Sequence, residues 1–393
     1  MISKRVQLIK PSLTLAINSR VKMLKQRGID VINFGVGEPD FDTPKNIKKA
    51  AICAIENGFT KYCPVAGTLE IKNAIINKLR RDNNLTFNPE EIIVSCGAKH
   101  ALYNLFQSII NPDDEVIIPS PYWVSYPDMV FLACGKPVIL ETTDKTNFKI
   151  TPEDIEKVIT PKTKAIVINS PSNPTGVTYF PQELKNIATI CVKNNLIIIS
   201  DDIYEKLSYD NLKFVSITDV YPEAKKYTVI INGVSKAYAM TGWRIGYAAG
   251  PKNIIEAMSK IQSQSTSNAS SISIKAATEA LNGPQEYIEF MRKEFEKRRN
   301  YIVERLNKIK NVTCRKPEGA FYVFPNISTF LGRSIHGKII NTDIEFTEHL
   351  LDIAKIAIIP GTAFGAKGYI RLSYATSIEN IKTGIDKFEN FIK

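Results

Sequence analysis

Seven short apolar runs, separated by segments of helical length, constrain this chain more than any other feature. They lie at 92–95, 115–118, 137–140, 165–168, 196–199, 228–231 and 245–249. Most are continuously apolar rather than alternating, which is typical of strands buried on both faces. Segments 99–110, 122–133 and 181–194 are long enough for crossover helices. The pattern predicts an α/β fold with a mostly parallel central sheet between layers of helices.

The rest of the chain predicts a second, smaller domain. A helical stretch at 252–310, broken near Gly283 and Pro284, follows the last apolar run. Beyond it we expect strands at 320–324 and 369–373 and helices at 343–354 and 377–392. We therefore expect 46–284 to form a large ligand-binding domain, and 285–393 to form an α+β domain that includes the N-terminal segment 1–45.

Composition and charge exclude several classes of protein. The 393 residues carry a net charge of +11, but basic and acidic residues are interleaved, as at 292–299, which is typical of a solvated helix face. No apolar run approaches the roughly 18 residues of a membrane span, and no signal-peptide pattern is present. We expect a cytoplasmic protein without a nucleic-acid or membrane partner. The six cysteines and three histidines show no ligand spacing, so we expect reduced thiols and no metal site.

Polar residues follow four of the expected strands at the point where each strand ends. These residues are Gly97-Ala98-Lys99, Asn173, Asp201 with Tyr204, and Ser235 with Lys236. Each has an ordinary alternative as a turn former or helix cap. Because ligands of open parallel sheets bind outside the carboxyl ends of the strands, their joint placement predicts a site at this edge.

Lys236 indicates the chemistry of that site. A lysine becomes an amine nucleophile when desolvation or a nearby cation lowers its pKa from about 10.4. A carbonyl cofactor that bears a phosphate would form an imine with this amine. Ser235 and Arg244 would donate hydrogen bonds to its phosphate. Asp201 could pair with a protonated pyridine nitrogen, and Arg371 in a C-terminal strand suits the capture of a carboxylate. Alone, Lys236 could be a loop lysine and Arg371 a partner in a surface salt bridge.

Several segments together resemble the fold-type-I aminotransferases that depend on pyridoxal phosphate. The similarity covers nearly the whole chain, and it is strongest to bacterial aspartate aminotransferases of the subgroup that also accepts prephenate. It is carried by Lys10-Pro11-Ser12, Gly37-Glu38-Pro39-Asp40-Phe41, Tyr62, Gly97-Ala98-Lys99, 169–176, Asp201-Asp202-Ile203-Tyr204-Glu205 and 235–246. The subgroup commonly has Asp-Glu where this chain has Asp201-Asp202, a position expected to face away from the cofactor.

The resemblance implies a cofactor, pyridoxal 5'-phosphate, bound in the large domain. Lys236 would form an imine with it and then carry the proton, while Asp201 would face the pyridine nitrogen. The other implied or chemically suited contacts are Asn173 and Tyr204 at the ring oxygen, Trp123 on the ring face, and Gly97, Ala98, Lys99, Ser235, Arg244 and the Tyr62 of a second subunit at the phosphate. The expected assembly is therefore a homodimer with shared active sites.

The resemblance also implies the substrates, which are amino acids and 2-oxo acids. The α-carboxylate side would meet Arg371, Gly37, Trp123 and Asn173, and the distal carboxylate would meet Ser12, Thr14 and Lys99. Lys10 matches the prephenate-using subgroup. The expected reaction is transamination of aspartate with 2-oxoglutarate to give oxaloacetate and glutamate, together with amination of prephenate to arogenate.

Two rival classes remain at this stage. A dinucleotide enzyme is disfavoured because Asp40 stands where the third glycine of the Gly35-Val36-Gly37 pattern is needed, and Pro39 interrupts the helix start. Another fold-type-I enzyme, such as an aromatic or alanine aminotransferase, a carbon–sulfur lyase or a decarboxylase, would share Lys236 and Asp201. The complete catalytic set disfavours a non-enzymatic binding module.

Overall fold

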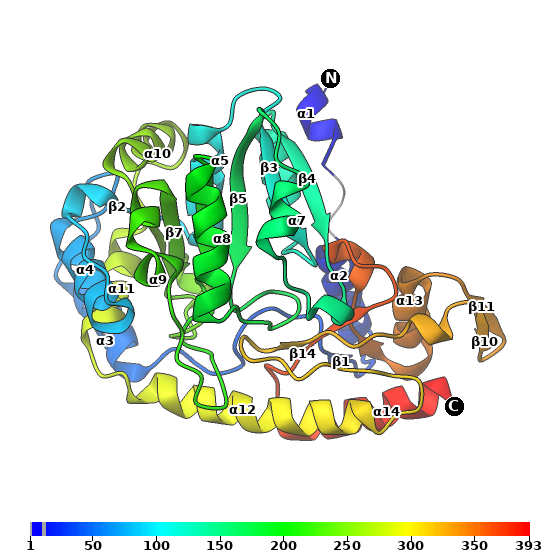
Figure 1. Ribbon diagram of the computed structural model, residues 1–393. Coiled ribbons are helices and arrows are strands. Elements are labelled where there is room, and N and C mark those ends of the chain that lie inside the picture. The colour runs from blue at the N-terminus through cyan, green and yellow to red at the C-terminus, as the bar shows by residue number, and fades with distance from the viewer. Residues whose placement is uncertain (1, 10–12) are drawn as a thin grey trace.

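A seven-stranded sheet forms the centre of the larger part of the computed structural model, which describes residues 2–9 and 13–393 (Figure 1). We call it the large sheet. Its strands, in spatial order, are β2 (Ile92–Ser95), β8 (Gly246–Ala249), β7 (Thr228–Gly233), β6 (Ile197–Asp201), β5 (Thr163–Asn169), β3 (Glu115–Ser120) and β4 (Lys136–Glu141).

The strands from β7 to β4 are parallel, whereas β8 runs antiparallel to both β2 and β7. The predicted α/β architecture is confirmed. The register pairs Asn169 at the end of β5 with Asp201 at the end of β6, and Asp201 with Ile231 of β7. β5 and β6 therefore end at one level and β7 ends two residues further on, which places the residues after all three strands at a common edge.

Helices cover both faces of the large sheet because its strands are apolar on both sides. On β5, Ala165 and Val167 face one cluster of buried side chains, and Ile166 and Ile168 face another. The first face packs against α5 (Ala98–Ile109), α6 (Ser125–Leu132) and α10 (Lys252–Ser265). The second packs against α7 (Pro152–Glu156), α8 (Pro181–Lys193) and α9 (Ile217–Val220), and near β2 and β8 against α3 (Lys45–Glu56), α4 (Leu69–Asn83) and α11 (Ser271–Asn282) (Figure 1).

The remaining elements are built from the two ends of the chain. Their helices are α1 (Lys4–Gln7), α2 (Leu13–Gln26), α12 (Glu286–Asn307), α13 (Asp343–Ala354) and α14 (Ile378–Ile392). Their strands are β1 (Ile32–Asn33), β9 (Tyr322–Val323), β10 (Arg333–Ile335), β11 (Lys338–Ile340), β12 (Ile356–Ala357), β13 (Ile359–Pro360) and β14 (Ile370–Ser373). Short 3-10 helices lie at Pro89–Glu91, Asp144–Thr146, Pro222–Tyr227, Thr241–Trp243, Ser328–Phe330 and Gly361–Phe364.

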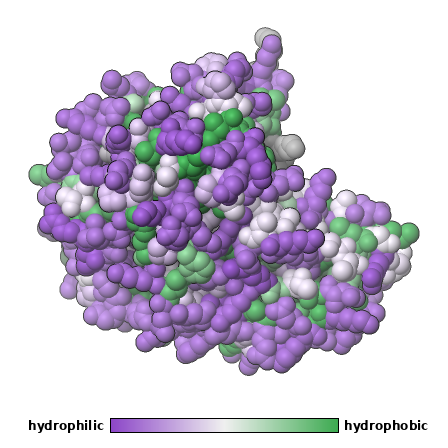
Figure 2. Space-filling model, viewed as in Figure 1, coloured by the Kyte–Doolittle hydropathy of each residue, from purple (hydrophilic) through white to green (hydrophobic). Residues whose placement is uncertain are grey.

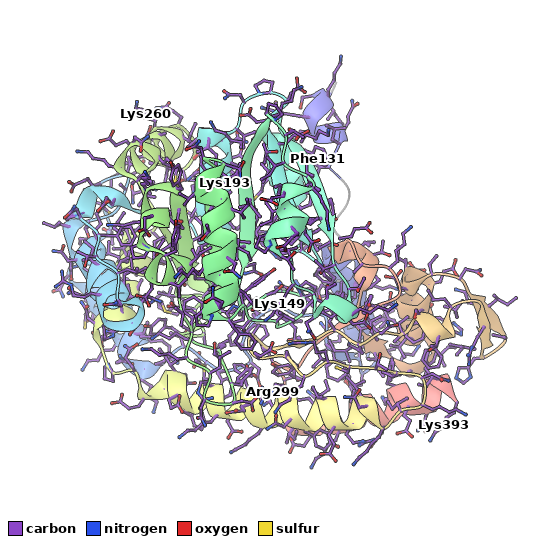
Figure 3. All side chains as sticks on the ribbon, in the orientation of Figure 1. Phe131, Lys149, Lys193, Lys260, Arg299 and Lys393 are labelled. Carbon is purple, nitrogen blue, oxygen red and sulfur yellow. The ribbon has the colours of Figure 1, made fainter. Side chains whose placement is uncertain are left out.

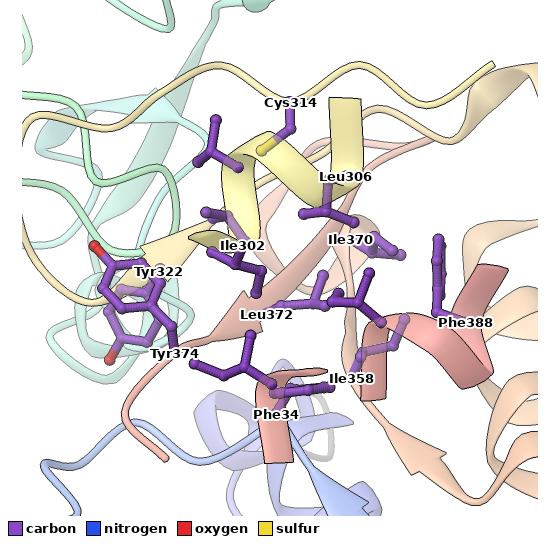
Figure 4. Close-up of a cluster of buried hydrophobic side chains, with 14 of the residues drawn as sticks. Phe34, Ile302, Leu306, Cys314, Tyr322, Ile358, Ile370, Leu372, Tyr374 and Phe388 are labelled. Carbon is purple, nitrogen blue, oxygen red and sulfur yellow. The ribbon is translucent and has the colours of Figure 1, made fainter. Parts of the chain in front are cut away.

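A separate hydrophobic core joins the N-terminal segment to the C-terminal elements. Strand β1 pairs in parallel with β12, and β14 lies between β13 and β9 in an antiparallel sheet. Phe34 is fully buried among side chains that include Ile302, Leu372 and Phe388 (Figure 4). The domain boundaries at 45/46 and 284/285 stay a prediction.

Two expected elements differ from the structure. The helical stretch 252–310 is divided into three helices, because a break at 266–270 precedes the one near Gly283. The side chain of Ser270 accepts a hydrogen bond from the backbone of Ser273 and so starts α11. The expected strand at 320–324 is paired only at Tyr322 and Val323. Ala320 has a positive φ of 56°, which ends the extended backbone on that side.

The surface seen in Figure 2 is mostly hydrophilic, with apolar residues in small groups. In the part of the chain that the structure describes, no helix combines the length and the apolar character needed to cross a membrane.

A buried arginine ties α12 to the turn at Asp210. Arg299 lies on α12 (Figure 3). It is fully buried and makes two hydrogen bonds of 2.8 Å to the Asp210 carboxylate. Its guanidinium also donates to the carbonyl of Pro317 at 3.0 Å and lies 4.8 Å from the centre of the Tyr209 ring. Hydrogen bonds from Arg299 hold the pKa of Asp210 below its usual value.

Asp210→Ala should destabilise the fold by leaving the buried Arg299 without its bidentate partner. Glu296 lies 3.5 Å from the guanidinium and offsets part of the loss, so we expect a reduction in unfolding free energy of about 2–3 kcal/mol, measured by denaturant titration. Because the pKa of Asp210 is lowered on folding, its contribution is present above about pH 4 and is lost as the pH falls through the folded pKa.

Lys316→Ala is the matched control, since Lys316 contacts Asp210 from the exposed side at 3.1 Å. It should change the unfolding free energy by less than about 0.5 kcal/mol. Equal losses in the two variants would contradict the importance of the buried charge.

Candidate active site

A cavity of about 250 Å³ lies at the carboxyl ends of β5, β6 and β7. It brings together most of the residues that the sequence predicts for a site. Those lining it are Thr14, Gly37, Ala98, Lys99, Trp123, Asn173, Asp201, Tyr204, Ser235, Lys236, Arg244 and Arg371. The cavity therefore joins residues of the large sheet to residues from both ends of the chain.

Asp201 is a buried carboxylate at the end of β6. Its side chain accepts a 2.6 Å hydrogen bond from the Tyr126 hydroxyl and a 3.3 Å bond from the backbone of Ile203. Burial raises the pKa of Asp201 to about 6, against the opposing effects of these hydrogen bonds and of Lys236. At neutral pH this carboxylate is mostly charged and can pair with a cationic ring nitrogen.

Asn169 fixes the loop that carries Asn173. Its side chain donates to the backbone carbonyl of Asp201 at 2.9 Å and accepts from the backbone of Asn173 at 2.9 Å. The amide of Asn173 is thereby held at the cavity, where its side-chain oxygen accepts a 3.0 Å hydrogen bond from Arg371.

Lys236 lies in the turn after β7 and points at the N-terminal segment. Its Nζ donates a 2.6 Å hydrogen bond to the carbonyl of Gly37. Desolvation lowers the pKa of Lys236 to about 8, with Arg371 and Arg244 acting in the same direction and Glu38 opposing them. A substantial fraction of the amine is therefore neutral near pH 8, as a nucleophile or base requires.

The start of α5 offers a cradle for an anion. Gly97 precedes this helix with a φ of 88°, and Ala98 and Lys99 of the first turn line the cavity. The first turn of a helix has backbone N–H groups without partners in the helix, and these can bind an anion. A side chain at Gly97 would lie 2.5 Å from a guanidinium nitrogen of Arg244. Arg244 is held by a 2.8 Å hydrogen bond to the carbonyl of Thr241, and Ser235 lines the same cavity.

Arg371 on β14 is a buried cation with one unused donor. It is 3% exposed, and its two Nη atoms donate to Asn173 at 3.0 Å and to the carbonyl of Gly35 at 2.8 Å. Its Nε is buried without a hydrogen-bond partner. Within the described residues no acidic side chain forms an ion pair with it. The guanidinium is thus free to receive a carboxylate.

Lys99, Trp123 and Thr14 also line the cavity. The Nζ of Lys99 lies 4.9 Å from the centre of the Trp123 ring, and burial followed by repulsion from Arg244 lowers the pKa of Lys99. The hydroxyl of Thr14 is buried without a partner. Lys10 and Ser12 lie outside the described residues. Tyr62 does not line the cavity, and its side chain is 91% exposed.

Three residues of the site were missed in the sequence. Asn169 begins the 169–176 segment that carries the resemblance but has no predicted role there, Tyr322 lies within an apolar run, and Tyr126 follows Trp123 by three residues. The Tyr322 hydroxyl lies 2.8 Å from that of Tyr204, and its ring centre lies 4.5 Å from the Arg371 guanidinium. The spacing of Trp123 and Tyr126 was a usable signal, since residues three apart share a helix face.

The residues present fit pyridoxal phosphate. A phosphate suits the cradle of Gly97, Ser235 and Arg244, a protonated ring nitrogen suits Asp201, and an aldehyde suits the amine of Lys236. The unpartnered Nε of Arg371 leaves a donor for a carboxylate in the same cavity. Among the residues that the structure describes, no group of three His, Cys, Asp or Glu side chains could hold a metal ion.

Comparison with known proteins points to the same chemistry. Residues 29–388 match the family model described as aminotransferase class I and II. The chain is 52% identical over 392 residues to the aspartate aminotransferase of Geobacillus stearothermophilus, covering 100% of this chain and 99% of the relative. It is 52% identical over 390 residues to the probable aspartate/prephenate aminotransferase of Rickettsia bellii, covering 99% and 98%.

Solved structures agree over the full length. The crystal structure of the aspartate aminotransferase from Rhizobium meliloti superimposes with a TM-score of 0.97 at 43% identity, covering 100% of this chain and 98% of the other. The aspartate aminotransferase of Thermus thermophilus with maleate gives 0.93 at 43%, covering 100% and 99%. The fold, the family and the cavity lead to one conclusion: the chain is an enzyme that belongs to the class I and II aminotransferases.

Proposed function

We propose that this enzyme uses pyridoxal phosphate to transfer the amino group of aspartate to 2-oxoglutarate, giving oxaloacetate and glutamate. We propose further that it aminates prephenate to arogenate. One observation carries the proposal. A single cavity joins an amine of lowered pKa, Lys236, to a buried carboxylate, Asp201, and to the unpartnered donor of Arg371.

The substrate class is supported by the relatives. Their names include aspartate aminotransferase and aspartate/prephenate aminotransferase, and the Thermus thermophilus enzyme was solved with maleate, a dicarboxylate. Two cations of this chain, Arg371 and Lys99, line the cavity and could bind the two ends of such a molecule. Aspartate, glutamate and prephenate each carry two carboxylates, so one pair of cations serves all three.

The residues of the chain act as holders and as a proton carrier. Arg371 would bind the α-carboxylate, with Asn173 fixing the guanidinium, and Asp201 would hold the ring nitrogen in its cationic form. The cofactor, when bound, supplies an electron sink. Lys236 would then accept the proton of the substrate α-carbon at Nζ and donate it to the carbon on the other side of the substrate nitrogen. Its pKa of about 8 permits both steps near neutral pH.

We also propose a homodimer in which Tyr62 reaches the phosphate of the partner subunit. Tyr62 is 91% exposed, and Ile52, Ile55 and Leu69 on the adjoining helices α3 and α4 are also more than half exposed. Such a group of exposed apolar side chains suits an interface with a second copy of the chain.

The first test concerns the covalent attachment. Borohydride reduction of the enzyme with pyridoxal phosphate, followed by peptide mapping, should label Lys236, because its amine is the one held at the cavity with a lowered pKa near 8. A label on Lys99 or Lys260 instead would overturn the assignment. Lys236→Ala should still bind the cofactor weakly but should lose transamination.

The second test concerns the shared site. Tyr62→Phe should weaken retention of the cofactor, which can be followed by dialysis and absorbance. A chain lacking Tyr62 mixed with a chain lacking Lys236 should regain one working site per dimer. No recovery in the mixture would mean that Tyr62 acts within its own subunit or not at all.

The third test separates the two cations by substrate. Arg371→Ala should lower kcat/KM by about two to three orders of magnitude for every substrate, since each loses the partner of its α-carboxylate. Lys99→Ala should impair aspartate, glutamate and prephenate while sparing monocarboxylic amino acids. Lys10→Ala should lower prephenate turnover more than oxaloacetate turnover.

Each comparison is a ratio of kcat/KM values for two substrates on one variant, so that general damage to the fold cancels. Lys260→Ala, on the exposed face of α10, is the control and should leave all ratios unchanged. If the wild-type enzyme does not aminate prephenate with aspartate as donor, the second activity fails and aspartate transamination remains.

A further inference from the structure

We propose that Tyr126 is a positioning residue for the cofactor, because its hydroxyl holds Asp201 in the orientation that faces the ring nitrogen. The inference rests on the proposed function and deepens it. Tyr126 stands on α6, which packs on one face of the large sheet, whereas Asp201 and Lys236 lie at the ends of its strands. Its side chain is buried, with 2% exposed.

The geometry fixes both carboxylate oxygens of Asp201. The Tyr126 hydroxyl donates to Oδ2 at 2.6 Å, and the backbone N–H of Ile203 donates to Oδ1 at 3.3 Å. Two donors from two different elements prevent rotation of the carboxylate about its χ angle. Asp201 and Tyr126 both line the cavity, so the remaining lone pairs of the carboxylate face the space that a ring would fill.

Tyr126 also contacts the residue proposed to cover the ring face. The Trp123 and Tyr126 rings meet edge to face with centres 5.3 Å apart, and the backbone N–H of Tyr126 donates to the carbonyl of Trp123 at 3.1 Å. One turn of chain at the start of α6 thus places Trp123, which would cover the cofactor ring, beside Tyr126, which holds Asp201.

The charges around Asp201 make the hydroxyl important. Asp201 faces Tyr126 from α6, Lys236 from the turn after β7, and Tyr204 and Asp202 from its own loop. Of these, Lys236 becomes bound to the cofactor in the proposed function. A charge on Asp202 would repel the charge on Asp201. The Tyr126 hydroxyl is therefore the side-chain donor that, together with the backbone N–H of Ile203, continues to stabilise the charged carboxylate in the loaded enzyme.

Tyr126→Phe removes this donor with little change in shape. The dissociation constant for pyridoxal 5'-phosphate, titrated into the cofactor-free full-length chain by absorbance, should rise about tenfold. Burial already raises the pKa of Asp201 to about 6, and loss of the donor raises this pKa further, so Asp201 becomes protonated at a higher pH than in the wild type. The ratio of the dissociation constant of the variant to that of the wild type should therefore be larger at pH 6 than at pH 8.5.

A double-mutant cycle distinguishes positioning from a merely structural role. In an Asp201→Asn background, Tyr126→Phe should produce no further tenfold loss, because the charge it supports is gone. Tyr179→Phe is the matched control. It removes another buried tyrosine hydroxyl, one that accepts from the backbone of Ile150 at 3.1 Å outside this cavity, and it should leave the dissociation constant unchanged.

The outcomes separate the inference from the proposed function. If the wild type does not bind pyridoxal phosphate, the proposed function fails. If the wild type binds it and Tyr126→Phe binds it equally well at both pH values, the inference alone is overturned. An equal loss in the wild-type and Asp201→Asn backgrounds would also overturn it, since Tyr126 would then act through packing.

Discussion

The buried charge of Arg371 is the constraint around which the rest of the cavity is organised. Taking a guanidinium out of water is costly unless its donors are satisfied and its charge is balanced. Here Asn173 and the Gly35 carbonyl satisfy two of its nitrogens, and the rings of Tyr322 and Phe364 lie 4.5 and 5.0 Å away. None of these groups supplies a negative charge. The fold therefore holds a buried cation whose charge no described acidic side chain balances in an ion pair, which is the arrangement that the proposed binding of a carboxylate requires.

The position of this cation depends on elements far apart in the sequence. Asn173 belongs to the loop after β5, Gly35 to the segment after β1, and Arg371 to β14. The small β13–β14–β9 sheet carries the guanidinium to the edge where the strands of the large sheet end. Packing of the N-terminal segment against the C-terminal elements thus fixes the position of Arg371 as well as contributing to stability.

The sequence predicted the large sheet and most of the predicted site residues that line the cavity at its edge. Buried parallel strands are recognisable as continuous apolar runs, and the polar residues that follow such strands lie at one edge of the sheet. The sequence did not predict the contacts between those residues. Tyr126 and Asp201 are joined by a hydrogen bond that depends on how α6 packs on the sheet. The spatial order of the strands cannot be predicted from their amino-acid composition. Tyr322 was overlooked for a similar reason, since one hydroxyl within an apolar run carries no periodic signal. The break before α11 depends on the cap at Ser270, a local effect within a helical composition.

The residues that line the cavity come from two parts of the fold, the large sheet and the elements built from the two ends of the chain. The ends of β5, β6 and β7 supply Asp201, Lys236 and the residues suited to a cofactor, whereas Arg371 and Tyr322 come from the small C-terminal sheet and Thr14 from α2. Under the proposed function, substitutions in this second group would alter which substrate is recognised and would leave Lys236 and Asp201 in place. On that proposal, a descendant of this chain could acquire a new substrate through substitutions at a few peripheral positions, while the inherited chemistry is preserved.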